Sequence, residues 1–591
     1  MYLRAFTARS LESLPIRPSV FTRSLPADSH TSSTTEGSHS ESLLRVSRPV
    51  HNAVFAYVPP ETSPNPKVLA VSSYAVQDLE LDPEESKTEA FAHVFAGNKI
   101  LEGTRPWALC YAGHQFGQFA GQLGDGRAIS LFETVSSKGD KFELQLKGAG
   151  RTPFSRFGDG LAVLRSSIRE FLVSEHMYAL GVPTTRSLAL TATGKRVYRQ
   201  DAPPEAKQPE RGATVARMAP SWLRFGNFEI FFSRGDMENV RNLADYAIEN
   251  VLPEEKGTEE GNKYERFFTR VTKRTAKMVA EWQSIGFCHG VMNTDNMSIL
   301  GLTLDYGPFQ ILDFYDPENI CNHSDHTGMY SFKRQPTVCV LNLFKLSIPL
   351  FELIGAGDAA DSIVYPIKGR DDLELTSKET LDAYREAGRE KVTKILTNDF
   401  SDWFMADLTE KMRSKLGFTN SNKDDMDDIV IPLLDWLTEY AVDYHSFFRS
   451  LADYPITDAG EDQDTKKALE TLSIVTQDPG VLEDSKSQLK TWLSIYRHRL
   501  LEEGPEKYGD KRKRMNRVNP RFVLRNWIAQ DVVNAFEDLS DEEARGVLDS
   551  CLKACVDPFE DNYEDQRIEK WINTGVPEVK FSSSSYIFLT L

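Results

Sequence analysis

The chain has 591 residues, of which 40% are hydrophobic and 26% charged, and its formal net charge at pH 7 is −18. This length predicts several folded units, and the negative charge argues against nucleic acid as the main partner, because phosphate binding requires a basic surface. No apolar run approaches the ~20 residues needed to span a bilayer, and six scattered cysteines favour a reducing compartment over a disulfide framework.

The first 25 residues contain four arginines and a single acid, Glu12. An arginine-rich, acid-poor N-terminus is typical of a mitochondrial transit peptide, and a plain disordered tail has a similar composition. Residues 27–42 are rich in Ser, Thr, His and Gly and have too little apolar surface to fold. We therefore expect a transit peptide and a disordered linker over residues 1–42, a mitochondrial location, and a folded body that starts near Val46.

The next recognisable elements are strands and a helix. Residues 128–132 and 142–146 alternate in polarity around a turn-like stretch, which predicts a β-hairpin. Residues 161–180 carry apolar side chains on one helical face and end at Gly181 and Pro183, which predicts a helix.

The second half of the chain is predicted to be mainly helical. The expected helices cover residues 271–285, 338–354, 376–396, 431–452 and 489–501. A hairpin and helix followed by a mainly helical part is the order of a two-lobed, protein-kinase-like α+β fold. The expected divisions are an N-terminal part with the nucleotide-binding lobe (43–250), a C-lobe with catalytic loop and metal site (251–440), and a helical C-terminal region with tail (441–591).

A kinase-like loop follows the helix at 271–285. The catalytic loop of kinases has the pattern His-x-Asp-x-x-x-x-Asn and is followed by Asp-Phe-Gly. In this chain His289 and Asn296 keep the loop spacing, and Asp305-Tyr-Gly stands in place of Asp-Phe-Gly. Val291 occupies the position of the kinase base and cannot accept a proton. Asp295 is the carboxylate placed to do so instead. Asn296 and Asp305 provide the hard oxygen ligands that Mg²⁺ prefers.

Two Gly-Asp-Gly turns flank the hairpin. Gly124 and Gly126, followed by Arg127, precede the hairpin, and Asp159 and Gly160 precede the next helix. Glycines let backbone amides approach a phosphate closely, and a helix N-terminus attracts anions, although most such turns are ordinary turns.

Four charged side chains complete the expected phosphate site. Lys147 leaves the second strand and Glu170 lies on the following helix, which is the layout of the kinase Lys–Glu pair; a surface salt bridge is the alternative. Arg217 and Arg224 could together hold a terminal phosphate, although each alone would be an ordinary surface arginine.

These motifs resemble the selenoprotein O family of protein adenylyltransferases, also called SelO/YdiU-type pseudokinases. The resemblance rests on runs that begin at residues 111, 123, 146, 155, 164, 183, 224, 289, 320 and 519, such as Tyr111-Ala-Gly-His-Gln-Phe-Gly and Leu146-Lys-Gly-Ala-Gly. It implies a kinase-like pocket that binds ATP in reversed orientation and transfers AMP to Ser, Thr or Tyr hydroxyls of proteins, releasing pyrophosphate.

The resemblance also implies roles for particular residues. Asp295 is expected to accept the proton, and Asn296 and Asp305 to hold Mg²⁺ (Mn²⁺ being an alternative); the role of Glu170 in supporting Lys147 follows from the kinase-like layout described above. The implied nucleotide contacts are Gly124, Gly126, Arg127, Lys147, Asp159, Gly160, Arg217, Arg224 and Asp305. A conventional ATP-dependent phosphotransferase and a non-catalytic nucleotide-binding pseudokinase remain the alternatives.

The C-terminal tail departs from the family pattern. Family members typically carry a Cys or selenocysteine in a tail of the type Ser-Cys-Ser-Ser, whereas residues 581–585 here are Phe-Ser-Ser-Ser-Ser, with Ser583 at the redox position. The resemblance also implies that Cys321 matches the body cysteine that pairs with the tail. Ser583 cannot form that disulfide, so AMP transfer is expected to respond little to the redox state of the buffer.

Overall fold

The computed structural model describes residues 8–16, 19–31, 41–198, 208–253, 261–367, 370, 372–457, 460–472 and 482–574. Within these residues the chain is a mixed α/β protein in which the main sheet is formed before residue 220 and the later part is mostly helical. The α+β character expected from the sequence is confirmed.

The main sheet has eight strands, and its hydrogen-bonded order is β1-β3-β6-β7-β10-β9-β2, with β8 added beside β10. All neighbouring strands are antiparallel. The strands are β1 (Phe55–Tyr57), β2 (Lys67–Val71), β3 (Trp107–Leu109), β6 (Ala128–Val135), β7 (Lys141–Lys147), β8 (Ala162–Val163), β9 (Arg186–Val197) and β10 (Glu210–Ala219).

The predicted hairpin is confirmed as β6 and β7, which pair through the register Ile129↔Leu146. The turn between them contains Gly139 at φ 91°, a conformation that glycine adopts without steric cost. At the end of β7, Lys147 lies between Ala128 of β6 and Val215 of β10. The hairpin thus places Lys147 on a central strand of the sheet, with a neighbouring strand on each side.

Two smaller antiparallel pairs lie outside the main sheet. They are β4 (His114–Gln115) with β5 (Gln118–Phe119), and β11 (Phe287–Cys288) with β12 (Gln310–Ile311). The second pair brackets the kinase-like loop, so both ends of that loop are held by backbone hydrogen bonds.

The helices before residue 300 include α5, which packs on β9 and β10 of the sheet. Their bounds are α1 (Val20–Ser24), α2 (Glu41–Leu44), α3 (Ser73–Asp78), α4 (Glu89–Phe95), α5 (Leu164–Ala179), α6 (Gly226–Ser233), α7 (Met237–Tyr246) and α8 (Lys263–Ser284). The predicted helices over 161–180 and 271–285 are confirmed. The second begins at Lys263, where Asn262 caps it by accepting a hydrogen bond from the Glu265 amide.

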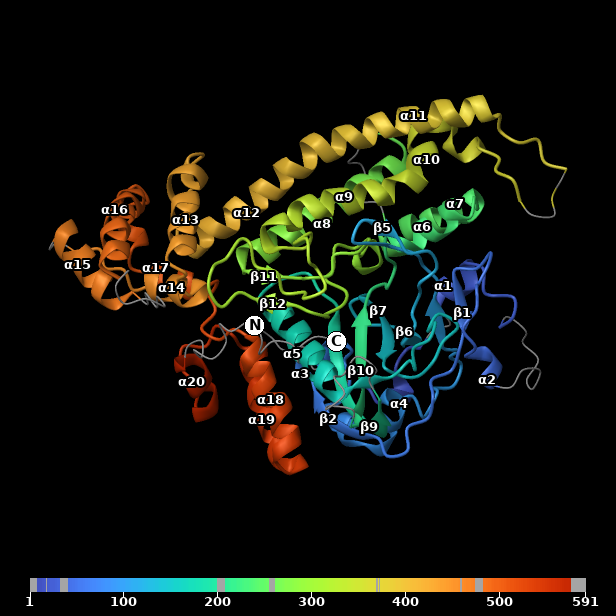
Figure 1. Ribbon diagram of the computed structural model, residues 1–591, viewed down its shortest axis with the longest axis horizontal. Helices are drawn as coiled ribbons and strands as arrows, with labels where there is room; N and C mark the ends of the chain where they lie inside the picture. Colours follow the sequence, from blue (N-terminus) through green and yellow to red (C-terminus); the bar gives the residue numbers. More distant parts are fainter. Residues whose placement is uncertain are drawn as a thin grey trace.

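The later helices form a layer along α8 and a separate group beyond it (Figure 1). Their bounds are α9 (Gln335–Ser347), α10 (Phe351–Gly355), α11 (Lys378–Lys394), α12 (Phe400–Leu416), α13 (Ile431–Glu439), α14 (Tyr444–Leu451), α15 (Glu461–Thr471), α16 (Leu482–Leu501), α17 (Lys511–Asn516), α18 (Asn526–Asp538), α19 (Asp541–Val556) and α20 (Gln566–Asn573). The single helix expected over 431–452 is wrong: it is two helices, because Asp443 caps α14 by accepting from the Ser446 amide.

Two separate cores divide the C-terminal region. Residues between Met412 and Met515 have a core of their own, whereas residues from Phe522 to Trp571 belong to the core that contains the sheet. Helices α18 and α19 pack on α5, so the end of the described chain returns to the first half of the protein (Figure 1). The described part of the region 441–591 is therefore shared between two cores.

One helical stretch, Phe332–Gly355, has the length and apolar composition of a membrane span. Its most apolar window is 67% buried inside the protein, as expected for a helix that belongs to the core. Length and composition alone are weak support for a membrane span, and the described residues hold no second stretch of this kind.

The N-terminal segment is packed on the body. Leu11 and Phe21 lie in the main core, and Ser19 donates a hydrogen bond of 2.7 Å to Glu133 of β6. The expectation that the folded body starts near Val46 is therefore wrong, because apolar residues at 11, 14, 21 and 25 find partners far along the chain. The linker at 32–40 and the first seven residues lie outside the described residues.

Candidate active site

Lys147 is one of the charged residues that meet at the centre of the sheet. Its Nζ lies 2.8 Å from Glu170 Oε2 and 2.9 Å from Asp305 Oδ1. Lys147 comes from the end of β7, Glu170 from the second turn of α5 and Asp305 from the segment after the kinase-like loop. The structure thus brings together three residues that the sequence predicts to act at one site.

Both predicted arginines reach the same carboxylate. Arg217, on β10, donates to Asp305 Oδ1 at 2.6 Å and to Glu170 Oε1 at 3.0 Å. Arg224 donates to Asp305 Oδ2 at 2.7 Å and to the backbone carbonyl of Asp295 at 2.7 Å. They are not surface arginines, since their side chains are only 2% and 3% exposed.

Aromatic rings and a further acid hold these arginines in place. The Arg217 guanidinium lies 4.5 Å from the Trp222 ring, and that of Arg224 lies 4.8 Å from the Tyr111 ring. Arg224 is also 3.7 Å from Asp125, which accepts hydrogen bonds from the Leu109 amide and the Tyr111 hydroxyl. Cation–π contacts of this kind fix a guanidinium without neutralising its charge.

Asp305 is the focus of the local electrostatics. Burial alone would raise its pKa, but Lys147, Arg224 and Arg217 hold the pKa well below its usual value. Asp305 is therefore ionised across the physiological pH range. The Nε atoms of both arginines are buried and have no acceptor among the described residues, so the cluster holds more donors than the protein satisfies.

The kinase-like loop places Asp295 next to this cluster, in the short 3₁₀ turn Thr294–Asn296. Burial raises the pKa of Asp295 to about 6, against the opposing effect of Arg224. The Asn296 side-chain nitrogen donates to the Val291 carbonyl at 3.0 Å, which leaves the amide oxygen as its remaining ligand atom.

His289 has a structural position in the loop. Its ring lies 5.3 Å from that of Trp282, and burial lowers its pKa to about 4, so it stays neutral. Its backbone amide donates to Gln335 Oε1 at 2.8 Å. These contacts fix the start of the loop.

The two Gly-Asp-Gly turns lie against the backbone that follows Lys147. Gly148 donates to the Arg127 carbonyl at 2.7 Å, and Gly150 donates to the Gly160 carbonyl at 3.0 Å. A side chain at Gly160 would lie 2.2 Å from the Gly150 backbone, so only glycine permits this approach. The turns therefore reach the same stretch of chain from two sides.

One feature of the turns differs from expectation, namely the position of Gly160 relative to the helix that follows it. The predicted helix starts at Leu164, after β8, so Gly160 is not at its N-terminus and gains nothing from its dipole. Asp159 accepts a hydrogen bond from the Leu161 amide, and the Arg127 side chain is exposed. Gly124 and Gly126 pack against Phe154 and its neighbour.

A group of residues that sequence reasoning had not singled out covers the loop from the other side. The hairpin β4–β5 brings the His114 amide to 2.7 Å from Thr294 Oγ1, and His114 Nδ1 to 2.7 Å from Glu229. Gln115 Nε2 donates to both carboxylate oxygens of Asp295, at 3.4 and 3.3 Å. The sequence signal for His114 and Gln115 was the motif at 111–117, and Glu229 and Thr294 lie in the runs that begin at 224 and 289, all taken as part of the family resemblance.

Two cysteines lie at the base of the loop. Cys321 Sγ is 3.5 Å from Cys288 Sγ and 3.2 Å from the Pro308 carbonyl. All six cysteines are free, and five are buried; Cys321 is the exception. The tail with Ser583 lies outside the described residues.

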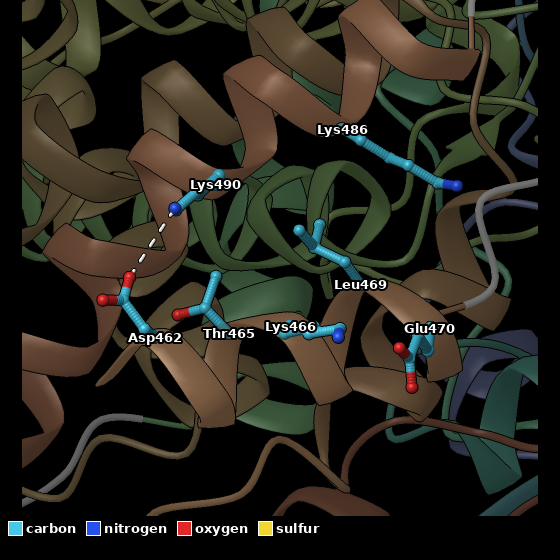
Figure 2. A pocket seen from close by; sticks show the side chains of 7 residues that line it. All are labelled: Asp462, Thr465, Lys466, Leu469, Glu470, Lys486 and Lys490. Carbon is cyan, nitrogen blue, oxygen red and sulfur yellow. Dashed lines mark ion pairs between the residues drawn. The ribbon is translucent and has the colours of Figure 1, made fainter. Parts of the chain in front are cut away.

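A separate groove lies between α15 and α16 (Figure 2). It has a volume of about 520 Å³ and mixed charges, with an exposed ion pair between Asp462 and Lys490 at 3.6 Å. Its lining residues, on two helices of the second core, include none of the predicted site residues. Within the described residues there is also no cluster of three or more His, Cys, Asp or Glu side chains that could hold a metal.

Comparison with known proteins gives a consistent result. The family described as "Protein adenylyltransferase SelO" matches residues 46–552. The chain is 38% identical to the protein nucleotidyltransferase YdiU of Methylobacillus flagellatus, covering 92% of this chain and 93% of the relative. It is 37% identical to a protein of Schizosaccharomyces pombe named "Protein adenylyltransferase SelO, mitochondrial", covering 94% and 95%. The chain therefore belongs to the SelO family of protein adenylyltransferases.

Proposed function

We propose that this chain transfers AMP from ATP to a Ser, Thr or Tyr hydroxyl of a protein, on a two-lobed kinase-like fold. The observation that carries the proposal is the convergence of Lys147, Arg217 and Arg224 on Asp305. Family membership supports the reaction class, since relatives are named adenylyltransferases or nucleotidyltransferases.

The three cations suit a pyrophosphate leaving group. A kinase needs one Lys at this position to hold the non-transferred phosphates. Here two buried arginines add bidentate donors, and the Nε of each has no acceptor in the described part of the chain. Such donors are best used by the β- and γ-phosphates of a nucleotide bound in reverse, which leaves the α-phosphate as the group that is transferred.

The loop supports the proton transfer. The acceptor hydroxyl oxygen attacks the α-phosphorus, the bond from that phosphorus to the bridging oxygen breaks, and pyrophosphate leaves with the bonding electrons. The hydroxyl proton passes to Asp295, the role that Val291 at the usual base position cannot fill. Stabilisation of charge on the leaving group by the cations is expected to give most of the rate enhancement.

The residues present fit Mg²⁺, with Mn²⁺ as the alternative. Asn296 retains a free amide oxygen and Asp305 is an ionised carboxylate, so each residue offers one hard oxygen ligand. Mg²⁺ commonly takes one or two ligands from the protein and the rest from phosphates and water. When bound, the ion would neutralise charge on the phosphates. The protein's own part is to hold Asp305 between three cations.

Labelled ATP tests the proposed reaction. The purified chain is incubated with ATP labelled on either the α- or the γ-phosphate, using the chain itself as acceptor. Label from the α-position should enter protein and label from the γ-position should not. Stable incorporation of γ-label would favour the conventional phosphotransferase, and incorporation of neither, with ATP bound, would favour the non-catalytic pseudokinase.

We further propose a mitochondrial location. The arginine-rich N-terminus supports it, as does the name of the Schizosaccharomyces pombe relative, although bacterial relatives are equally similar. Fusing residues 1–45 to a fluorescent protein should send that protein to mitochondria. A fusion that remains in the cytosol would refute the proposal.

A further inference from the structure

The hairpin β4–β5 is anchored to the kinase-like loop through residues on both sides of Gln115. On one side, the His114 amide donates to Thr294 Oγ1 at 2.7 Å, and Glu229 accepts from Thr294 Oγ1 at 2.5 Å. On the other side, the Phe116 amide donates to the Tyr330 hydroxyl at 2.8 Å, which itself donates to Asn293 at 2.7 Å. The residues before and after Gln115 are thus tied to the residues just before Asp295.

This double anchor aims Gln115 at one target. Its amide nitrogen lies 3.4 and 3.3 Å from the two carboxylate oxygens of Asp295. Within the described part of the chain, Gln115 is the side chain that donates to that carboxylate. Its two N–H groups match the two oxygens, so rotation of the carboxylate would break at least one contact.

Close packing limits the carboxylate further. Gly113, at the start of the hairpin, approaches so closely that a Cβ at this position would lie 2.4 Å from Asp295 Oδ1. Arg224 holds the backbone of the same residue through its carbonyl at 2.7 Å. Asp295 is therefore fixed through its main chain by Arg224 and through its side chain by the hairpin.

We infer that Gln115 is a positioning residue, which orients the Asp295 carboxylate toward the incoming acceptor hydroxyl. The inference rests on the proposed function, in which Asp295 accepts the hydroxyl proton. Proton transfer requires a near-linear approach at hydrogen-bond distance, and misplacing a reacting group by about 1 Å can cost roughly 100-fold in rate. Gln115 touches neither the nucleotide-binding cations nor Asp305, so its effect should appear in turnover and not in ATP binding.

The hairpin offers a matched control. Gln118 pairs with Gln115 across the hairpin, has the same side chain and is exposed. The variants Gln115→Leu and Gln118→Leu therefore remove one amide each from the same element. Gln115→Glu keeps the size but turns a donor into a carboxylate, and Gln115→Asn keeps the amide on a shorter side chain.

The experiment measures incorporation of label from ATP into the full-length chain at saturating ATP, and the ATP concentration that gives half the maximal rate. The maximal rate of Gln115→Leu and Gln115→Glu should fall roughly 10- to 100-fold, with the half-saturating concentration unchanged within twofold. Gln115→Asn should retain more activity than either. Gln118→Leu should match the wild type, and thermal unfolding should be the same for all variants that are compared.

The outcomes separate the inference from the proposed function. If the wild type transfers AMP and Gln115→Leu is as fast as Gln118→Leu, or loses ATP affinity in step with rate, the positioning role is wrong. If the wild type transfers the γ-phosphate, the same comparison applies to that reaction, because Asp295 would again be the proton acceptor. If neither label is incorporated, the proposed function fails together with any role for Gln115 in it.

Discussion

Asp305 is the residue on which the site depends, because it neutralises part of the charge of three cations. Lys147, Arg217 and Arg224 all lie within 3 Å of its oxygens, and its side chain is 19% exposed. Breaking a buried ion pair leaves charge without compensation, which costs far more than losing an exposed pair. The same carboxylate is a proposed metal ligand, so its removal should affect stability and turnover independently.

Asp305→Ala should abolish turnover and lower the free energy of unfolding by about 3–5 kcal/mol in the absence of nucleotide, because three buried cations lose their shared partner. Asp382→Ala, which removes an exposed ion pair with Arg385, is the control and should leave turnover and the free energy of unfolding nearly unchanged. Urea unfolding and label transfer measure the two effects. A stable, inactive Asp305→Ala would show that the cations need no compensation.

Cys321 is the one cysteine of the six that is not buried. Alkylation of the native chain should therefore label one thiol per molecule, and Cys321→Ser should remove that label, whereas unfolding should expose all the remaining thiols. Mass spectrometry of the intact chain measures both numbers. Labelling of Cys288 before Cys321 would contradict the burial seen here. AMP transfer in oxidising and in reducing buffer can be measured on the same samples, and we expect the two rates to be nearly the same.

The individual site residues were predictable to different extents. Asp295, Asn296 and Asp305 stand close together in the sequence, so the spacing of a known pattern was enough to select them. Gln115 lies 180 residues from its partner Asp295, and a single glutamine carries no chemical signature of its own. Its role depends on the packing of a hairpin on a distant loop, which periodicity and composition do not reveal.

At the scale of elements, the turns that follow and precede the strands decide the shape of the site. The hairpin β6–β7 was predictable because alternation of polarity and a glycine turn are local signals. The break between α13 and α14 was missed, because it depends on Asp443, which both caps α14 and pairs with Arg525 at 2.6 Å. The long-range pair stabilises a break that helix propensity alone does not favour.

Glycine at 160 is expected to be required by the fold. Gly160→Ala should be markedly less stable than Gly103→Ala, although both positions have positive φ, 71° and 77°. The strain of a left-handed residue, about 1–2 kcal/mol, is common to both variants, but only at Gly160 would the new Cβ meet backbone atoms at 2.2 Å. Urea unfolding measures the difference. Equal stability would show that the two Gly-rich segments can separate without cost.

At the scale of the whole molecule, segments distant in sequence hold the sheet together. Helices α18 and α19 cover α5, and the N-terminal segment places Phe21 5.5 Å from Phe55 and 5.4 Å from Tyr246. Composition predicted a targeting segment here and gave no sign of this packing, because the apolar residues are too few to suggest a core. Their partners come from three other parts of the chain.

Truncation of this segment tests how much the body depends on it. A chain that begins at residue 33 should unfold at a clearly lower urea concentration than one that begins at residue 8, because it loses four buried apolar side chains and the pair between Arg48 and Asp28. Each large apolar side chain contributes about 1.5–3 kcal/mol when fully buried.

The chain that begins at residue 8 is the matched control, since it keeps all of these contacts and should be as stable as the full-length protein. Equal stability of the two truncated chains would show that the segment contributes nothing to the body, and that residues 8–31 can be removed after import without loss. If the shorter chain is instead destabilised, we expect any processing on import to leave the segment from Arg9 onward in place, and N-terminal sequencing of the imported protein should find it there.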